Sequence, residues 1–349
     1  MAQRHTICGI AAIILCGGGV LAQDATSAAP TQTKDARVYG LANPKPKAEG
    51  TIRLATYNLF NLFDDRDDPS MTERNEDIDD TTPANQKQAL ADTIHRLDAD
   101  ILAVEEIENR SALIEFREEY LKDMGYDYVM SIDTGDDRGI ENAVLSRFPI
   151  THAEVWPNLP LGGIHPEKYG NDVNWYAGQP ITFKRSPMRA DVSIDRDKDG
   201  ESDYTLTLFV MHHKSGTYNN YWREAESKKV VQLIDTVQKR NKNANIAVLG
   251  DFNARAVDMS VATYIAAGLM DPFAGRVPHD PEIQTHESNR RIDFILINPA
   301  LANEYVPNSI FVLGTPARPK GSDWRTTPAP QGWASDHYPV AIDLVPNDQ

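Results

Sequence analysis

Polar and ionisable residues recur where short apolar runs of this sequence end, and their types suit one kind of chemistry. Some directly follow an apolar run, one lies inside a run, and a Ser-Asp-His triplet precedes the last run. In chain order they are Asn58, Glu106, His212, Asp251, Asn253, Asp293, Asp336 and His337. Ligand sites of α/β folds are built at strand ends, so these residues are candidates for a single site.

Each of these residues alone also has an ordinary structural interpretation. A lone Asn or Glu after a strand is usually a turn residue or a solvated charge, and Gly-Asp-Phe-Asn suits a turn. Their recurrence favours chemistry, because Asp, Glu and Asn supply the hard oxygen ligands that magnesium prefers. A nearby carboxylate can deprotonate water, and a histidinium can stabilise charge on a phosphoryl group. The set therefore indicates hydrolysis of a phosphate ester, with a metal that neutralises the phosphate.

The elements that must position these residues are short strands alternating with helical patterns from Thr51 onward. Strands are expected over residues 52–57, 101–104, 143–146, 190–194, 205–211, 246–249, 292–297 and 340–344. Helices are expected over residues 85–97 and 222–239, whose apolar side chains fall on one face. No composition break marks a second domain, so the pattern predicts one α/β domain with mixed sheets.

Several segments taken together resemble the endonuclease/exonuclease/phosphatase superfamily, from Thr51 to about Pro346. The similar segments are residues 55–64, 99–107, 139–147, 209–215, 250–254, 291–296 and 335–340. Gly-Asp-Phe-Asn and Ser-Asp-His are specific signals when they occur together in this order. The resemblance implies a four-layered α/β sandwich over residues 51–349, with two packed mixed β-sheets flanked by helices. Its nearest branches would be the pancreatic deoxyribonuclease-like and bacterial secreted nuclease-like enzymes.

The resemblance implies a metal site formed by Asn58, Glu106 and Asp336, with Glu106 as the principal ligand. The implied ion is Mg²⁺, with Mn²⁺ as the alternative. The sequence departs from the family at Glu105, where Gln is common. A glutamate there would add charge beside the metal.

The resemblance also implies catalytic roles for the other members of the set. His337 would face the phosphate and Asp293 would orient its ring. Asp251 would orient or deprotonate the attacking water, while Asn253 contacts phosphate. His212 matches the family's second histidine.

Neighbouring residues leave some of these assignments open. His213 stands where the family usually has an apolar residue, so either histidine of the pair is a candidate for the functional one. Glu141 is a candidate support for His212, and Lys214-Ser215 is a candidate phosphate contact.

The N-terminus predicts export. Arg4 and His5 precede an apolar, glycine-containing run that ends in Val-Leu-Ala, as in a signal peptide over residues 1–22. The alternative, a retained membrane anchor, would need a longer apolar run. Cys8 and Cys16 both lie in the removed segment, so disulfides and thiolate ligands are excluded from the mature chain. Residues 23–50 are predicted to be a flexible leader, and the protein to be periplasmic or secreted, without a membrane anchor after processing.

The composition is acidic, with 35 Lys+Arg against 51 Asp+Glu and a formal net charge of −16. This balance argues against a non-enzymatic nucleic-acid scaffold, which needs a general phosphate-binding charge. It permits an enzyme that meets its phosphoester substrate through a metal. A monomer is expected.

Two further features lie outside the candidate site. Asp195, Asp197 and Asp199 form the start of a calcium loop, although position twelve is Leu206 rather than Glu, so the alternative is a solvated acidic hairpin. Residues 162–183 form a long polar stretch that contains aromatic residues such as Trp175. These aromatics would either stack a base or pack the loop on itself.

The sequence therefore predicts a divalent-metal-dependent phosphodiesterase, a nuclease that hydrolyses DNA or RNA by metal- and histidine-assisted attack of water. One alternative is a phospholipase C, sphingomyelinase or phosphomonoesterase on the same scaffold. The absence of an apolar hairpin suited to a bilayer weighs against a sphingomyelinase. Another alternative is a binding protein that has lost catalysis, against which the complete candidate set argues.

Overall fold

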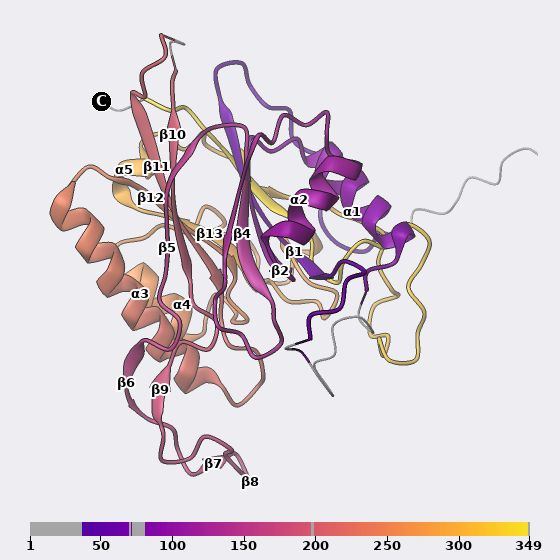
Figure 1. Cartoon of the computed structure of the whole chain (residues 1–349), viewed down its shortest axis with the longest axis vertical. Helices are drawn as coiled ribbons and strands as arrows, with labels where there is room; N and C mark the ends of the chain where they lie inside the picture. The colour runs from indigo at the N-terminus through magenta and orange to yellow at the C-terminus, as the bar shows by residue number, and fades with distance from the viewer. Residues whose placement is uncertain (1–36, 70, 72–80, 197–198, 348–349) are drawn as a thin grey trace, which may run out of the picture. The chain divides into compact units, whose positions relative to one another are not determined.

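The computed structural model describes residues 37–69, 71, 81–196 and 199–347, which belong to one compact unit. Two mixed sheets form its centre (Figure 1). The first sheet has the order β14 (Phe311–Val312), β15 (Val340–Leu344), β1 (Ile52–Leu62), β2 (Ile101–Ile107), β4 (Glu141–Ser146) and β3 (Tyr128–Ile132). The second has the order β13 (Asp293–Ile297), β12 (Asn245–Asp251), β11 (Tyr204–His212), β10 (Met188–Ile194) and β5 (Ile150–Val155).

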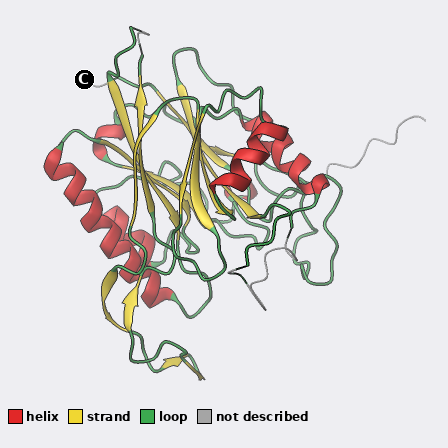
Figure 2. Cartoon of the chain, viewed as in Figure 1, coloured by secondary structure: helices red, strands yellow, loops and turns green. Residues whose placement is uncertain are grey.

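Helices cover the outer faces of both sheets, as Figure 2 shows. Their bounds are α1 (Ala84–Leu97), α2 (Arg110–Tyr120), α3 (Asn220–Arg240), α4 (Met259–Ala266) and the short α5 (Pro299–Ala302), with a 3₁₀ turn η3 (Pro281–Ile283). One apolar core lies between the sheets, a second joins the first sheet to α1 and α2, and a third joins the second sheet to α3 and α4. The predicted four-layered α/β sandwich is confirmed.

Strand direction brings the candidate residues to one edge. β1 runs parallel to β2, and β11 runs parallel to β12, so these strands end on the same side. β15 and β13 run antiparallel to them and therefore begin there. The register places Asp251 opposite His212 on one side and Asp293 on the other.

Side-chain alternation decides which of these residues face the space between the sheets. In β11, Leu206, Leu208 and Val210 pack into the inter-sheet core, and His212 continues their row. Phe209 and Met211 instead pack towards the helices. Asp251 and Asp293 extend the inner rows of β12 and β13 in the same way. The inner face is thus apolar along its length and polar at the edge.

A β-bulge in β2 changes the direction of Glu106. The register passes from Glu105 to Ile107 without a partner for Glu106, whose φ is 60°. A non-glycine residue in this left-handed region is strained, and such strain is typical of functional sites. Glu105 remains on the inner row of β2, while the bulge takes the side chain of Glu106 out of the regular alternation.

Residues 162–183, predicted as a loop without regular structure, form an arm of paired short strands. β6 (Pro160–Ile164) pairs with β9 (Pro180–Thr182), and β7 (Lys168–Tyr169) pairs with β8 (Asp172–Val173) near the tip. The arm extends beyond α3 (Figure 1). Glycines at positions 162, 163, 170 and 178 hide its strand pattern in the sequence.

The second half of the predicted leader also differs from expectation. The Gly40 and Leu41 N–H groups bond to backbone carbonyls of Pro281 and Val312, and the Tyr39 side chain is buried. Residues 37–42 thus pack onto the unit, while the predicted signal peptide and the leader up to residue 36 lie outside the described residues. No helix in the described part of the chain is long and apolar enough to span a membrane.

Candidate active site

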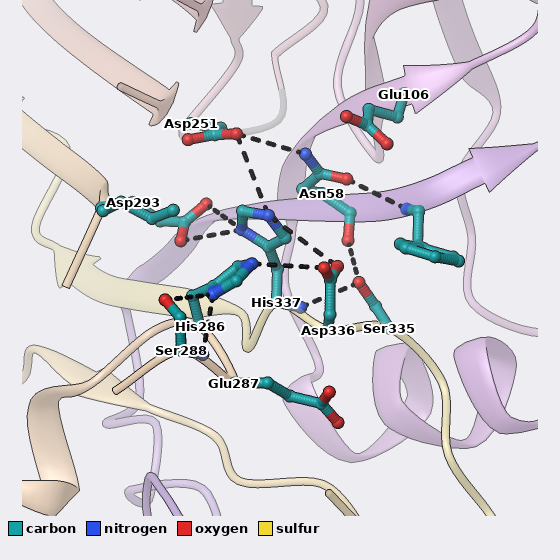
Figure 3. Close-up of polar contacts among 12 residues, drawn as sticks. Asn58, Glu106, Asp251, His286, Glu287, Ser288, Asp293, Ser335, Asp336 and His337 are labelled. Carbon is teal, nitrogen blue, oxygen red and sulfur yellow. Dashed lines mark hydrogen bonds and ion pairs between the residues drawn. The ribbon is translucent and has the colours of Figure 1, made fainter. Parts of the chain in front are cut away.

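His337 and Asp293 form a buried pair at the centre of the site (Figure 3). His337 Nδ1 lies 3.0 Å from both carboxylate oxygens of Asp293, so its N–H donates to them. Burial alone would lower the pKa of His337, but the carboxylates of Asp293, Asp251 and Asp336 outweigh burial and hold that pKa well above its ordinary value. His337 is therefore an imidazolium whose Nε2–H points away from Asp293.

Asp251 lies beside this imidazolium, with 3.9 Å between its Oδ2 and His337 Nε2. Its oxygens accept from the Asn253 backbone N–H at 2.7 Å and from Asn253 Nδ2 at 2.9 Å. Burial raises the pKa of Asp251 to about 7; His337 opposes the shift and Asp293 adds to it. Asp251 thus has the pKa of a general base that works near neutral pH.

Hydrogen bonds of Asn58 and Ser335 join the end of β1 to the loop that carries His337 and to Asp251 of the second sheet. Ser335 Oγ donates to the Asn58 carbonyl at 2.8 Å and accepts from the His337 N–H at 3.0 Å. Asn58 Nδ2 lies 3.5 Å from Asp251 Oδ2, and its Oδ1 accepts from the Phe60 N–H. The loop that carries His337 is thereby fixed to the end of β1.

Asp336 faces the same space, and His286 contacts it. His286 Nε2 lies 3.2 Å from Asp336 Oδ2, and its ring meets the His337 ring edge-on at 4.6 Å. Burial would raise the pKa of Asp336, but bonding to His286 and the charge of His337 lower it overall. Asp336 is thus held as a carboxylate.

Adjacent glutamates in β2 have different environments. Glu105 is fully buried; its Oε1 accepts from Thr56 Oγ1 at 2.8 Å, and its Oε2 has no hydrogen-bond partner among the described residues. Burial raises the pKa of Glu105 well above its ordinary value. The raised pKa favours the protonated form of Glu105, and the expectation that it adds charge beside the metal stays a prediction. Glu106 is partly exposed, and its Oε1 lies 3.3 Å from Arg138 Nη2.

His212 reaches the site from β11. Its Nε2 lies 3.4 Å from Glu106 Oε1, 3.6 Å from Asp251 Oδ2 and 2.7 Å from Arg185 Nη1. Burial, followed by the charges of Arg185 and Arg138, lowers the pKa of His212 well below its ordinary value. The expected support from Glu141 is not seen in the structure, because that carboxylate accepts from Ser131 Oγ instead.

His213 has a structural environment. Its Nδ1 lies 2.7 Å from Glu226 Oε2 of α3, and its Nε2 lies 3.1 Å from the Tyr264 hydroxyl of α4. It continues the outer row of β11, under the helices. The open choice between the two histidines therefore favours His212 at the site. Lys214 is half-buried over the Trp222 ring, and burial lowers its pKa.

The oxygen-rich donor set fits a divalent metal. Asp336 Oδ1 is buried without a hydrogen-bond partner within the described ranges, as expected of an oxygen that binds a cation. Asp251, Asp293 and His337, and separately His286, Asp336 and His337, place donor atoms within 4.8 Å of one another. Glu106 belongs to neither group, and in Figure 3 Asn58 lies between Glu106 and Asp336. The three implied ligands, Asn58, Glu106 and Asp336, are therefore not in mutual contact in this structure.

Sequence reasoning missed the cationic and imidazole groups of the site, namely Arg138, Arg185 and His286. Lys184 and Arg185 form a basic pair in the connection between β9 and β10, three residues before β10 begins at Met188, and this pair was the available signal. The predicted calcium loop includes Asp197, which lies outside the described residues, so that site stays a prediction.

Comparisons with known proteins agree with this architecture. The model of the Endonuclease/Exonuclease/phosphatase family matches residues 55–337. No curated protein matches the sequence. The human Nocturnin catalytic domain is similar with a TM-score of 0.53 at 12% identity, over 86% of this chain and 96% of that one. An endonuclease/exonuclease/phosphatase from Beutenbergia cavernae gives 0.52 at 16%, over 84% and 71%. Truncated Caenorhabditis elegans TDP2 gives 0.50 at 15%, over 84% and 97%. At these identities the similarity to solved structures shows the fold.

Proposed function

The chain belongs to the endonuclease/exonuclease/phosphatase family, and on that premise we propose that it is a divalent-metal-dependent phosphodiesterase that hydrolyses DNA or RNA. The observation that carries the proposal is the buried His337–Asp293 pair beside Asp251, whose pKa is about 7. An imidazolium and a base within 3.9 Å of each other suit attack of water on a phosphoryl group. We further propose export to the periplasm or medium, which the N-terminal sequence supports.

Magnesium or manganese would be held by Glu106, Asp336 and Asn58 and would supply positive charge to the phosphate oxygens. Asp251 would accept a proton from the attacking water, because its pKa makes it a base near neutral pH. Asn253 holds that carboxylate through two hydrogen bonds. His337 would donate its Nε2–H to a phosphoryl oxygen while Asp293 keeps the ring charged and oriented.

Phosphomonoester hydrolysis is the second candidate. Arg138 and Arg185 bring two guanidinium groups to Glu106 and His212. A terminal phosphate carries more negative charge than a diester, so two cations suit it. A monoester specificity would make sugar phosphates better substrates than DNA or RNA.

A lipid substrate has less support. The arm is a hairpin that exposes the apolar side chains of Ile164, Val173 and Trp175. However, the turn between β7 and β8 is Gly170-Asn171, and Asp172 follows it. A hairpin that enters a bilayer needs apolar residues at its turn, since polar groups are costly there.

The test is a substrate panel with magnesium, manganese or EDTA, which includes DNA, RNA, bis(p-nitrophenyl) phosphate, sphingomyelin, phosphatidylcholine and sugar phosphates. The adjacent variants E106Q and E105Q form a matched pair, because each removes one carboxylate from β2. We expect E106Q to lose metal-dependent turnover and E105Q to retain it, since burial raises the pKa of Glu105 well above its ordinary value. Absence of metal-dependent turnover on every substrate would favour a binding protein, and turnover on lipids or sugar phosphates alone would refute the nuclease.

A further inference from the structure

Arg185 is a buried cation inside the candidate site. It lies between β9 and β10, and its side chain is 6% exposed. Its Nη1 contacts His212 Nε2 at 2.7 Å, and its Nε contacts a carboxylate oxygen of Asp136. A charge this deeply buried needs partners on several sides, and these contacts supply them.

The contact with His212 fixes the direction of the hydrogen bond. A guanidinium has only donors and stays protonated in proteins. His212 Nε2 must therefore accept, which makes the imidazole neutral and places its proton on Nδ1. In this arrangement His212 has no Nε2–H to offer to a phosphate oxygen, and Arg185 carries the positive charge at this position.

Asp136 holds the other side of the guanidinium. This aspartate lies on the connection between β3 and β4, its side chain is 7% exposed, and it also lies 3.8 Å from Arg138 Nε. Two contacts on different nitrogens of a planar group fix its orientation, which a lysine ammonium would not reproduce. Arg185 is thus oriented before any substrate arrives.

Arg185 Nη1 also lies near the space where a phosphate would sit. The nitrogen that it contacts, His212 Nε2, is 3.4 Å from Glu106 Oε1 and 3.6 Å from Asp251 Oδ2. One hydrogen-bond length therefore separates the guanidinium from the atom that borders both carboxylates. An anion between Glu106 and Asp251 would lie beside His212 Nε2, and Arg185 Nη1 lies 2.7 Å from that nitrogen. His337 Nε2, from the opposite sheet's side, lies 3.9 Å from Asp251 Oδ2.

We propose that Arg185 is a phosphate-binding catalytic residue that replaces His212 as the cation on the β11 side of the site. His212 and Asp136 are then positioning residues, which hold the guanidinium as acceptors. The inference deepens the proposed phosphoester hydrolase function and rests on it for the identity of the anion. Its chemistry is a charge-assisted, oriented contact with non-bridging phosphate oxygens.

The test measures binding of inorganic phosphate by calorimetry in magnesium buffer, alongside kcat and KM for bis(p-nitrophenyl) phosphate. The variants are R185A and R185K. The matched control is R189A in β10, because Arg189 pairs with Asp191 on its own strand. We expect R185A to weaken phosphate binding about 10- to 150-fold, the effect of losing a hydrogen bond to a charged group. Added guanidinium ion should restore part of that loss, and R189A should bind as the wild type.

The possible results separate the inference from the proposed function. Unchanged phosphate binding in R185A, or absence of phosphate binding by the wild type, would overturn the role of Arg185. Wild-type phosphate binding that R185A loses, without phosphodiester turnover, would refute only the nuclease. If R185A fails to fold, R185K is the fallback variant, because it keeps a positive charge beside Asp136. An R185K protein that binds phosphate as tightly as the wild type would overturn the need for a guanidinium.

Discussion

Replacement of Asp293 by Asn should lower the pKa of His337, which Asp293 helps to hold well above its ordinary value. The pair is buried, with Asp293 2% and His337 6% exposed, and both carboxylate oxygens lie 3.0 Å from Nδ1. Asp293 is the foremost of the charges that raise the pKa of His337. Asn keeps the shape and removes the charge, so the pKa of His337 should fall towards its ordinary value.

The magnitude follows from the contact that is lost. A hydrogen bond to a charged group contributes about 1.5–3 kcal/mol, and about 1.4 kcal/mol corresponds to a factor of ten. If His337 acts as a cation, D293N should lower kcat/KM about 10- to 150-fold at neutral pH. The alkaline limb of the pH profile should also move to lower pH, because the ring loses its proton earlier.

The assay is kcat/KM for bis(p-nitrophenyl) phosphate between pH 5 and 10 with saturating magnesium. The matched control is D271N, which also faces a cation with a buried carboxylate, since Asp271 bonds Arg291 at 2.6 and 3.0 Å. D271N should change thermal stability and leave the alkaline limb in place. An alkaline limb that D293N leaves unmoved, in a folded protein, would refute the assignment of His337 as the cation.

The same pair makes a prediction about stability in EDTA. Because the folded pKa of His337 is raised, its contribution is fully present below its unfolded pKa of about 6.5 and is lost as pH rises through the folded pKa. The stability advantage of the wild type over D293N should therefore shrink with rising pH in urea titrations. An advantage that grows with pH would contradict the sign.

Three further substitutions test the scaffold and the arm. D343N leaves the 2%-exposed Arg53 without its 2.7 Å partner, so urea denaturation should show a loss of about 3–5 kcal/mol with kcat/KM of the folded protein unchanged. G250A should cost at least about 1–3 kcal/mol by thermal unfolding, because φ is 132° and a Cβ would lie 2.1 Å from Met211 O. W175A removes a 90% exposed ring and should leave the melting temperature unchanged. If the arm stacks a base, it should weaken single-stranded DNA binding by about 1–3 kcal/mol in anisotropy titrations, whereas unchanged affinity would assign the arm another role.

The sequence predicted those parts of the fold in which local periodicity and the buried face agree. The strand at Val340–Leu344 begins and ends as expected, and the long helix differs from its prediction by one or two residues at each end. Alternation in β11 also carries the distinction between His212 and His213, because the inner row of Leu206, Leu208 and Val210 ends in His212. The sequence alone therefore contained the alternation that separates His212 from His213, and the family resemblance showed which strand to inspect.

Other features depend on contacts between distant segments and leave little local signal. Arg185 can be recognised as a site residue only from its contacts with His212 of β11 and with Asp136 of the β3–β4 connection. The direction of Glu106 depends on a bulge with φ of 60°, which apolar periodicity does not reveal. The raised pKa of Glu105 arises from its complete burial between the sheets. Each is a property of packing rather than of composition.

The acidity of the chain is consistent with a phosphate substrate because charge at the site is arranged locally. Glu106, Asp251, Asp293 and Asp336 lie near two cations on opposite sheets: His337 contacts Asp293 and Asp251, and Arg185 contacts His212 beside Glu106. Asp293 neutralises His337 and Asp136 neutralises Arg185, so the apo site stays electronegative despite these cations. A polyanion would then bind well only after a divalent ion offsets the remaining carboxylates. Turnover should therefore depend strictly on metal, and most strongly at low ionic strength, where repulsion from the net charge of −16 is least screened.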